Sequence, residues 1–257
     1  TYTLYLDTNF FIQPFGDQSS GQRIIDAQTW SATEYVGTIM DGNAGVFGVN
    51  FIDGRIKGYP KYDRATGDER KAYFRFVRGT NEYGQNNFVD NGDGTISDLA
   101  TGLMWQQADD GLALDWEDAL AYAEDLQLAG HDDWRLPNAK ELQSIVDYSR
   151  SPQTSSSPAI DPLFETSEIM DPEGYAQYPY FWTGTNHQDG INHYDGAVYI
   201  AFGEAQGMMN GILMDVHGAG AQRSDPKTGN SDAYPQYFGP QGDLRSVFNY
   251  VRAVRDI

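Results

Sequence analysis

Three segments of the chain gather side chains that could bind a metal ion or a polar ligand, and the first, residues 90–98, reads DNGDGTISD. It crowds carboxylates among glycines, as calcium-binding loops do. Its register does not fit an EF-hand, because Gly94 at the obligatory glycine position puts Val89 and Ala100 where the first and last ligands belong. The turn of a β-hairpin is the simpler interpretation. The alternative is a calcium site of another kind, with the candidate ligands Asp90, Asn91 and Asp93.

The second segment, residues 186–195, is expected to form a loop between two strands. Its polar side chains are Asn186, His187, Asp189, Asn192, His193 and Asp195. On a loop held by a rigid sheet, such groups can hydrogen-bond sugar hydroxyls or supply oxygen ligands to calcium. An ordinary solvated loop is the competing interpretation. Zinc is disfavoured, because the two histidines lack helical i, i+4 spacing and a third fixed ligand.

The third segment, residues 215–229, offers two carboxylates, an imidazole and a guanidinium among glycines: Asp215, His217, Arg223 and Asp225. A ligand site is one interpretation, and a loop ordered by an internal Arg-Asp pair is the other. A hydrolase would need His217 as base, Asp215 to orient it and Ser224 as nucleophile. No G-x-S-x-G motif surrounds Ser224, so we predict that the protein is not an enzyme.

Composition narrows the class of partner. The chain has 257 residues, of which 40% are hydrophobic and 14% aromatic, so it can build packed cores. Its formal charge of -20 disfavours nucleic acid and anionic lipid and suits cations or neutral ligands. It has no cysteine, which excludes disulfides and thiolate chemistry. No apolar run approaches the roughly 18 residues of a membrane span, so none is predicted.

The elements that must position these side chains can be read from turn and capping signals. Residues 88–107 predict short strands joined at Asn-Gly and Asp-Gly turns. A helix should follow, capped by Asp115 and stopped by Gly130. A second helix should start at a capping box made by Asn138 and Glu141.

Other residues are assigned to structure. The stretch from about residue 210 to 244 is rich in Gly, Asp, Pro and Ser and predicts a long loop. Large aromatic side chains usually fill cores, which we expect of Trp105, Trp116, Trp134 and Trp182. We expect Arg252 and Arg255 to pair with carboxylates or backbone carbonyls.

An internal repeat organises the chain. TWSATEY at residues 29–35 parallels FWTGTNH at 181–187, and a strand, turn and return strand follow each of them. YFRFVRG at residues 73–79 likewise parallels the ending FNYVRAVRD at 248–256. We therefore predict three parts: residues 1–80 as the C-terminal half of a module, residues 81–87 as a linker, and residues 88–257 as a complete module.

The complete module resembles a known bacterial family. The phrases DNGDGTISDLATGLMWQQ, DDWRLPNAKELQSIVDY, YFWTGT and YVRAVRD closely resemble the DUF1566 family, also called the Lcl C-terminal domain. The resemblance implies a C-type-lectin-like fold of the α+β class, with mixed, mainly antiparallel sheets, two helices and long loops. It also implies glycan binding by a surface adhesin. Formylglycine-generating enzymes have a distantly related fold, but their activity needs cysteine, which this chain lacks.

The functional expectation is a lectin-like binding or adhesion module, secreted or on the cell surface, with the periplasm as a further possibility. Its expected partner is a glycan or a surface protein, and Ca²⁺ is the candidate cofactor. The alternative is a structural subunit of a homo-oligomer or filament. Because residues 1–80 lack the beginning of their module, we also expect the chain to derive from a longer polypeptide, or a neighbouring chain to complete the module.

Overall fold

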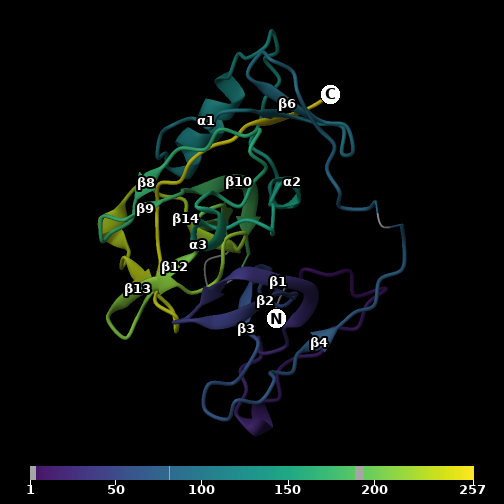
Figure 1. Ribbon diagram of the computed structural model, residues 1–257, viewed down its shortest axis with the longest axis vertical. Helices are drawn as coiled ribbons and strands as arrows, with labels where there is room; N and C mark the ends of the chain where they lie inside the picture. Colours follow the sequence, from purple (N-terminus) through teal and green to yellow (C-terminus); the bar gives the residue numbers. More distant parts are fainter. Residues whose placement is uncertain (1–3, 81, 189–193) are drawn as a thin grey trace.

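Strand pairing dominates this α+β structure, a computed structural model that describes residues 4–80, 82–188 and 194–257. The described residues form three short α-helices and several mainly antiparallel sheets. Figure 1 shows the N-terminal region, coloured purple to blue, below the teal-to-yellow remainder of the chain. The two are joined by a long blue connection that runs up one side of the molecule (Figure 1).

The first elements after this connection follow the predicted turns and caps. A four-stranded sheet has the order β17 (Val254–Asp256), β7 (Leu103–Gln106), β6 (Thr95–Asp98) and β5 (Phe88–Asp90). The hairpin prediction for residues 88–107 is thereby confirmed. Helix α1 (Trp116–Asp125) has Asp115 as its N-cap, as expected, but it ends at Asp125 rather than continuing to Gly130.

Helix α2 (Ala139–Ser144) starts at the predicted capping box. The Asn138 side chain accepts from the backbone of Glu141, and the Glu141 carboxylate accepts from the backbone of Asn138. A third helix, α3 (Pro152–Ser155), has Ser151 as its N-cap. Among the described residues, no helix is long and apolar enough to cross a bilayer.

A seven-stranded sheet unites segments that lie far apart in the sequence. Its order is β10 (Tyr180–His187), β11 (Gly196–Ala201), β14 (Gln222–Pro226), β3 (Arg55–Pro60), β2 (Asn43–Asn50), β1 (Thr29–Ile39) and β4 (Tyr73–Phe74). Strands β14 and β3 join antiparallel at Gln222 and Ile56. Beside this pair the Gly58 N–H donates to the His217 carbonyl at 2.7 Å. The N-terminal region therefore adds its strands to the sheet of the rest of the chain.

A hydrophobic cluster continues across this junction. Tyr35, Ile39 and Phe47 from the N-terminal region are buried together with Ala159 and Ala219, which belong to the rest of the chain. The side chains of Val146 and Tyr148 pack against the same cluster. Burying apolar surface in such a cluster stabilises the junction by about 25 cal/mol per Å² of buried area. Sheet and core thus continue from the N-terminal region into the rest of the chain.

The two outer hairpins of this sheet share a local irregularity. In the β1–β2 hairpin the register shifts between Trp30 and Glu34. In the β10–β11 hairpin it shifts between Trp182 and Asn186. In both hairpins, an advance of four residues on the first strand is matched by only two residues on the second. Each hairpin therefore carries a bulge directly after its Trp.

The stretch from residue 210 to 244 is not the loop that we expected. It contains β13 (Ile212–Asp215), β14, the 3-10 turn η2 (Ser231–Ala233), β15 (Tyr237–Phe238) and β16 (Asp243–Leu244). With β12 (Gln206–Met209), three of these strands form a sheet of order β13-β12-β16-β15. The return strand expected beside β11 is also corrected, because β14 occupies that position and β12 lies in the other sheet. Short strands of two to five residues in polar sequence give almost no periodicity signal.

The large side chains assigned to the core lie there. Trp105 and Trp182 are completely buried and Trp134 is nearly so, while Trp116 packs at the edge of the core. The buried Arg252 guanidinium donates to the carbonyls of Gln106, Gln107 and Glu165, as expected of a structural arginine. Arg255 donates to the Asp133 carboxylate at 2.6 Å.

Candidate functional site

The first predicted segment forms the β5–β6 turn. Asp90 accepts from the Gly92 N–H at 2.8 Å, and Asp93 accepts from the backbone and hydroxyl of Thr95. Asn91 donates to the hydroxyls of Thr95 and Ser97. These bonds hold the turn from within. Across the described residues, no group of three or more His, Asp or Glu side chains is arranged to hold a metal ion, and calcium stays a prediction.

The second segment is placed only in part, because Asp189, Asn192 and His193 lie outside the described residues. Asn186 accepts from the Lys227 ammonium group. His187 is buried, with its Nε2 2.7 Å from the Asp53 carbonyl and its ring stacked on Tyr5. It therefore contacts the N-terminal region, whereas Asp195 is exposed.

The third segment lies in the interior. Asp215, His217 and Asp225 are at most 4% exposed, and Arg223 pairs with Asp243. The internal Arg-Asp pair predicted within this segment is therefore wrong, because the partner of Arg223 is Asp243, outside the segment. Asp225 instead accepts from the Ser246 backbone at 3.1 Å.

Burial shifts the pKa values of these interior groups. Burial, followed by repulsion from Glu204, raises the pKa of Asp215 to about 7. Burial and the neighbouring Arg223 lower the pKa of His217 well below its usual value, so its ring is neutral at pH 7. The 2.8 Å contact between His217 Nε2 and Asp243 is therefore a hydrogen bond rather than an ion pair. The geometry gives no support to ligand contact at these three buried side chains.

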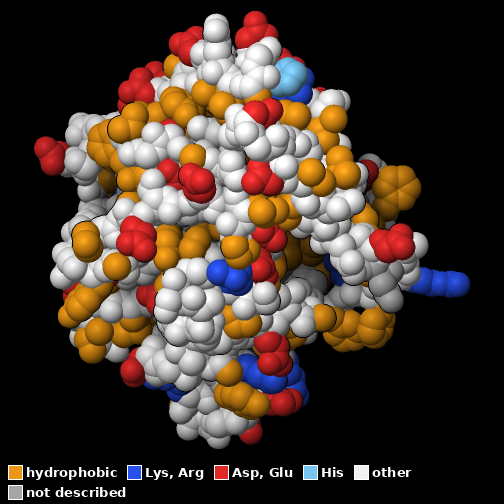
Figure 2. Space-filling model, turned by 45° about the horizontal axis from the view of Figure 1, so that its top comes forward, with side chains coloured by type: hydrophobic (Ala, Val, Ile, Leu, Met, Phe, Trp, Pro, Cys, Tyr) orange, Lys and Arg blue, Asp and Glu red, His pale blue; other side chains and the backbone are white. Residues whose placement is uncertain are grey.

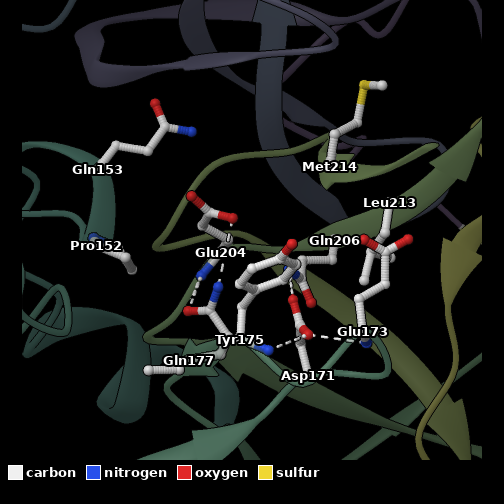
Figure 3. Close-up of a pocket in the computed structure, with 11 residues that line it drawn as sticks. Pro152, Gln153, Asp171, Glu173, Tyr175, Gln177, Glu204, Gln206, Leu213 and Met214 are labelled. Atoms are coloured by element: carbon white, nitrogen blue, oxygen red, sulfur yellow. Dashed lines mark hydrogen bonds between the residues drawn. The ribbon is translucent and has the colours of Figure 1, made fainter.

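An open hollow lies elsewhere, beside α3 and the hairpin of β8 (Ile169–Met170) and β9 (Ala176–Gln177). Its volume is about 330 Å³. The polar side chains that line it are Gln153, Asp171, Glu173, Tyr175, Gln177, Glu204 and Gln206 (Figure 3). Leu213 and Met214 of β13 complete the wall. Three carboxylates and three amides thus share one surface depression.

Asp171 holds the β8–β9 turn in shape. Its Oδ1 accepts from the backbone N–H groups of Glu173 and Tyr175, each at 2.9 Å. Its Oδ2 accepts from Gln206 Nε2 at 3.0 Å, a bond drawn in Figure 3. The Tyr175 side chain on this turn is 68% exposed. A fixed backbone therefore presents an aromatic ring to solvent at the rim of the hollow.

Glu204 lies opposite this turn, half-buried in the wall of the hollow. The buried Gln177 side chain donates to the Glu204 carboxylate at 3.3 Å and accepts from the Glu204 backbone N–H at 3.1 Å (Figure 3). Burial is the main cause that raises the pKa of Glu204, and the nearby Asp171 adds to it. The wall thus combines amide groups with a carboxyl group that takes up a proton more readily than usual.

Gln153 of α3 ties this wall to the N-terminal region. Its Oε1 accepts from the Thr38 N–H at 2.8 Å, and its Nε2 donates to the Thr38 carbonyl at 2.9 Å. Both backbone groups of one β1 residue are therefore bound by one side chain of the hollow.

Comparison with known families finds a match that covers much of the chain around this hollow. Residues 94–212 match the family model of the Lcl C-terminal domain. The match runs from the β5–β6 turn to the start of β13, and so holds α1, α2, the β8–β9 hairpin and most of the hollow. Among curated proteins and solved structures, none matches the chain.

Sequence reasoning missed the hollow because its residues are dispersed. Within the Lcl C-terminal match, the segment DPEGYAQ at residues 171–177 carries a turn signal, two acidic residues and a Tyr. That composition is the one local signal of a presented aromatic ring. Gln153, Glu204 and Gln206 come from other elements, and only the strand pairing brings them together.

Proposed function

We propose that residues 88–257 form a C-type-lectin-like binding module, secreted or at the cell surface, that takes a glycan in the hollow beside the β8–β9 hairpin. The observation that carries this proposal is the combination of an exposed Tyr175 ring with fixed amide and carboxylate groups. Sugar rings present an apolar face and a ring of hydroxyls. An aromatic face and paired donors and acceptors are the complementary chemistry.

The charge of the hollow selects among glycans. The hollow is lined by the carboxyl groups of Asp171, Glu173 and Glu204, whose negative charge would repel a sulfated or sialylated glycan. A neutral or amino sugar suits the site. The volume of about 330 Å³ lies at the lower end of the roughly 300–1,000 Å³ seen for ligand pockets, which favours one or two sugar units.

A binding experiment tests this proposal. The full chain is screened against an array of neutral and amino-sugar glycans, and the best binder is titrated by calorimetry with and without a calcium chelator. Tyr175→Ala should weaken binding by about tenfold, because an aromatic contact of this kind is worth roughly 0.5–1.5 kcal/mol. Sensitivity to the chelator would support the calcium prediction.

The matched control is Tyr83→Ala, which removes another tyrosine that is 95% exposed and does not line the hollow. It should leave the affinity unchanged. If no neutral or amino-sugar glycan binds, or if both variants bind as well as the wild type, the hollow is not a glycan site.

A further inference from the structure

Residues 74–77 expose an unusual amount of apolar surface. Phe74 is 65% exposed, Phe76 93% and Val77 92%. The rings of Phe74 and Phe76 meet edge to face at 5.1 Å. After β4, the described chain enters no further strand before β5. An extended apolar segment therefore lies at the edge of the seven-stranded sheet without a neighbouring strand in the described structure.

The same segment has a counterpart at the end of the chain. Tyr73 lies parallel to Thr29, directly before Trp30, and Tyr250 lies parallel to Phe181, directly before Trp182. These contacts align YFRFVR at residues 73–78 with YVRAVR at residues 250–255, so that Arg75 corresponds to Arg252.

The surroundings of these two arginines agree. Arg252 lies over the Phe164 ring and donates to the Glu165 carbonyl at 2.8 Å and the Thr166 hydroxyl at 3.2 Å. Arg75 lies over the Phe11 ring and donates to the Ile12 carbonyl at 2.7 Å and the Gln13 side chain at 3.2 Å. In both cases an aromatic ring, a carbonyl and a side-chain oxygen come from three successive residues.

The correspondence continues upstream to an Asp turn. The Phe11 N–H donates to the Asp7 carbonyl four residues back, as the Phe164 N–H donates to the Asp161 carbonyl three residues back, so the turn of the first copy has one residue more. Each Asp carboxylate also accepts from the backbone two residues later. Residues 7–78 therefore follow the course of residues 161–255, which in the second copy come after residues 88–160.

In the second copy, that earlier part covers the strand. Val254 pairs with Trp105 of β7 on one side, and exchanges backbone hydrogen bonds with Arg135 at 2.9 Å on the other. Val254 and Ala253 are completely buried, whereas their counterparts Val77 and Phe76 are more than nine-tenths exposed. The exposed residues Phe76 and Val77 therefore fit a partner that resembles β7, the strand that covers their counterparts.

We propose that residues 74–78 are an acceptor edge for a β7-like strand, supplied by the N-terminal half of another such module. Charge favours this occupant. Residues 55–80 carry eight Lys and Arg against three Asp and Glu, whereas residues 86–150, the half that would dock, carry three against fourteen. Figure 2 shows the blue side chains of the visible face mainly in its lower half, the side of the N-terminal region.

The test adds the N-terminal half of a module to the full chain. A second copy of residues 86–154, placed directly before Thr1, has the same spacing to Asp7 that the original copy has to Asp161. Hydrogen exchange of the Phe76, Val77 and Arg78 amides should slow by at least about tenfold, because a paired edge exchanges through local opening. Val77→Asp in the extended chain should abolish this protection, and Tyr83→Asp, at an equally exposed position, should not.

A second measurement applies if the extended chain does not fold. A synthetic peptide of residues 93–107 is added to the unextended protein, with a peptide carrying Leu103→Asp and Trp105→Asp as its control. Slower exchange at Phe76–Arg78 with the first peptide alone supports the proposal. No protection from either the extension or the peptide overturns it. Concentration-dependent protection in the unextended chain, with dimers in light scattering, also overturns it, because β7 of this chain is already paired on both sides and another surface of the second copy would then be the occupant.

Discussion

The buried hydrogen bond between Tyr35 and Asp215 should make the attachment of the N-terminal region depend on pH. The Tyr35 hydroxyl donates to Asp215 Oδ2 at 2.7 Å across 180 residues of sequence. Both side chains are at most 6% exposed. Asp215 Oδ1 is held separately by the N–H groups of His217 and Gly218. Tyr35→Phe removes one donor and leaves the other two in place.

The size of the effect follows from the charge state of Asp215. Its pKa is raised to about 7 in the folded protein, from 3.8 when exposed. The folded state therefore binds the proton more tightly, and stability is lost as pH rises from about 4 to 7, by up to roughly 4 kcal/mol. A hydrogen bond to an ionised group is worth about 1.5–3 kcal/mol and one to a neutral group about 1 kcal/mol. Tyr35→Phe should thus cost about 2 kcal/mol at pH 8.5 and about 1 kcal/mol at pH 5.

Urea unfolding at the two pH values measures this difference. The lowered pKa of His217 acts in the opposite direction, removing stability as pH falls below about 6.5. That contribution is common to wild type and variant, so it cancels in the free-energy difference to first order. In the background of Asp215→Asn, which cannot ionise, the cost of Tyr35→Phe should be the same at both pH values.

Tyr148→Phe is the matched control, because the buried Tyr148 hydroxyl accepts from Gln143 rather than donating to a carboxylate. Its cost should not change with pH. Equal costs of Tyr35→Phe at pH 5 and pH 8.5 would refute the reasoning, since Asp215 would then keep one charge state throughout.

Two further predictions concern the packing of buried residues. Arg252→Lys should destabilise the protein by about 3–5 kcal/mol, because a point charge cannot replace a fork that binds three carbonyls. Arg255→Lys, at a pair with the exposed Asp133, should cost less than about 1 kcal/mol. Thermal unfolding compares the two variants, and equal losses of stability would contradict the argument. Gly58→Ala should weaken the β3–β14 junction, because a Cβ there would lie 2.9 Å from the His217 carbonyl, whereas Gly79→Ala meets nothing within 4 Å. Limited proteolysis of residues 1–80 should accelerate in the first variant alone.

The parts predicted correctly from sequence are those whose signals are local. The Asp115 cap, the Asn138 and Glu141 capping box and the Asn-Gly hairpin each depend on residues within a few positions of one another. The hairpins that contain Trp30 and Trp182 carry similar bulges, and Tyr73 and Tyr250 make similar parallel contacts, while the repeat itself stays a prediction.

The candidate site could not be predicted in this way, for a physical reason. Asp215, His217 and Asp225 have the composition of a polar loop, and only the fold places them inside, through the pairing of β13 with β12 and of β14 with β3 and β11. Pairing between strands far apart in the chain leaves no mark in the spacing of either strand. For the same reason, Gln153, Asp171 and Glu204 gave no combined signal before the fold brought them to one hollow.

Strand β1 links the two surfaces that matter most. At one end, Thr38 is bound through both backbone groups by Gln153, which lines the hollow. At the other end, Thr29 and Trp30 pair with β4, from which the exposed residues 74–77 continue. A strand docked at the acceptor edge would hold residues 74–78 and β4, and β4 pairs with β1, which Gln153 fixes to the wall of the hollow. Because a paired β1 has fewer ways to open, docking should also reduce the motion of Gln153, so assembly at one surface would favour a preorganised binding site at the other.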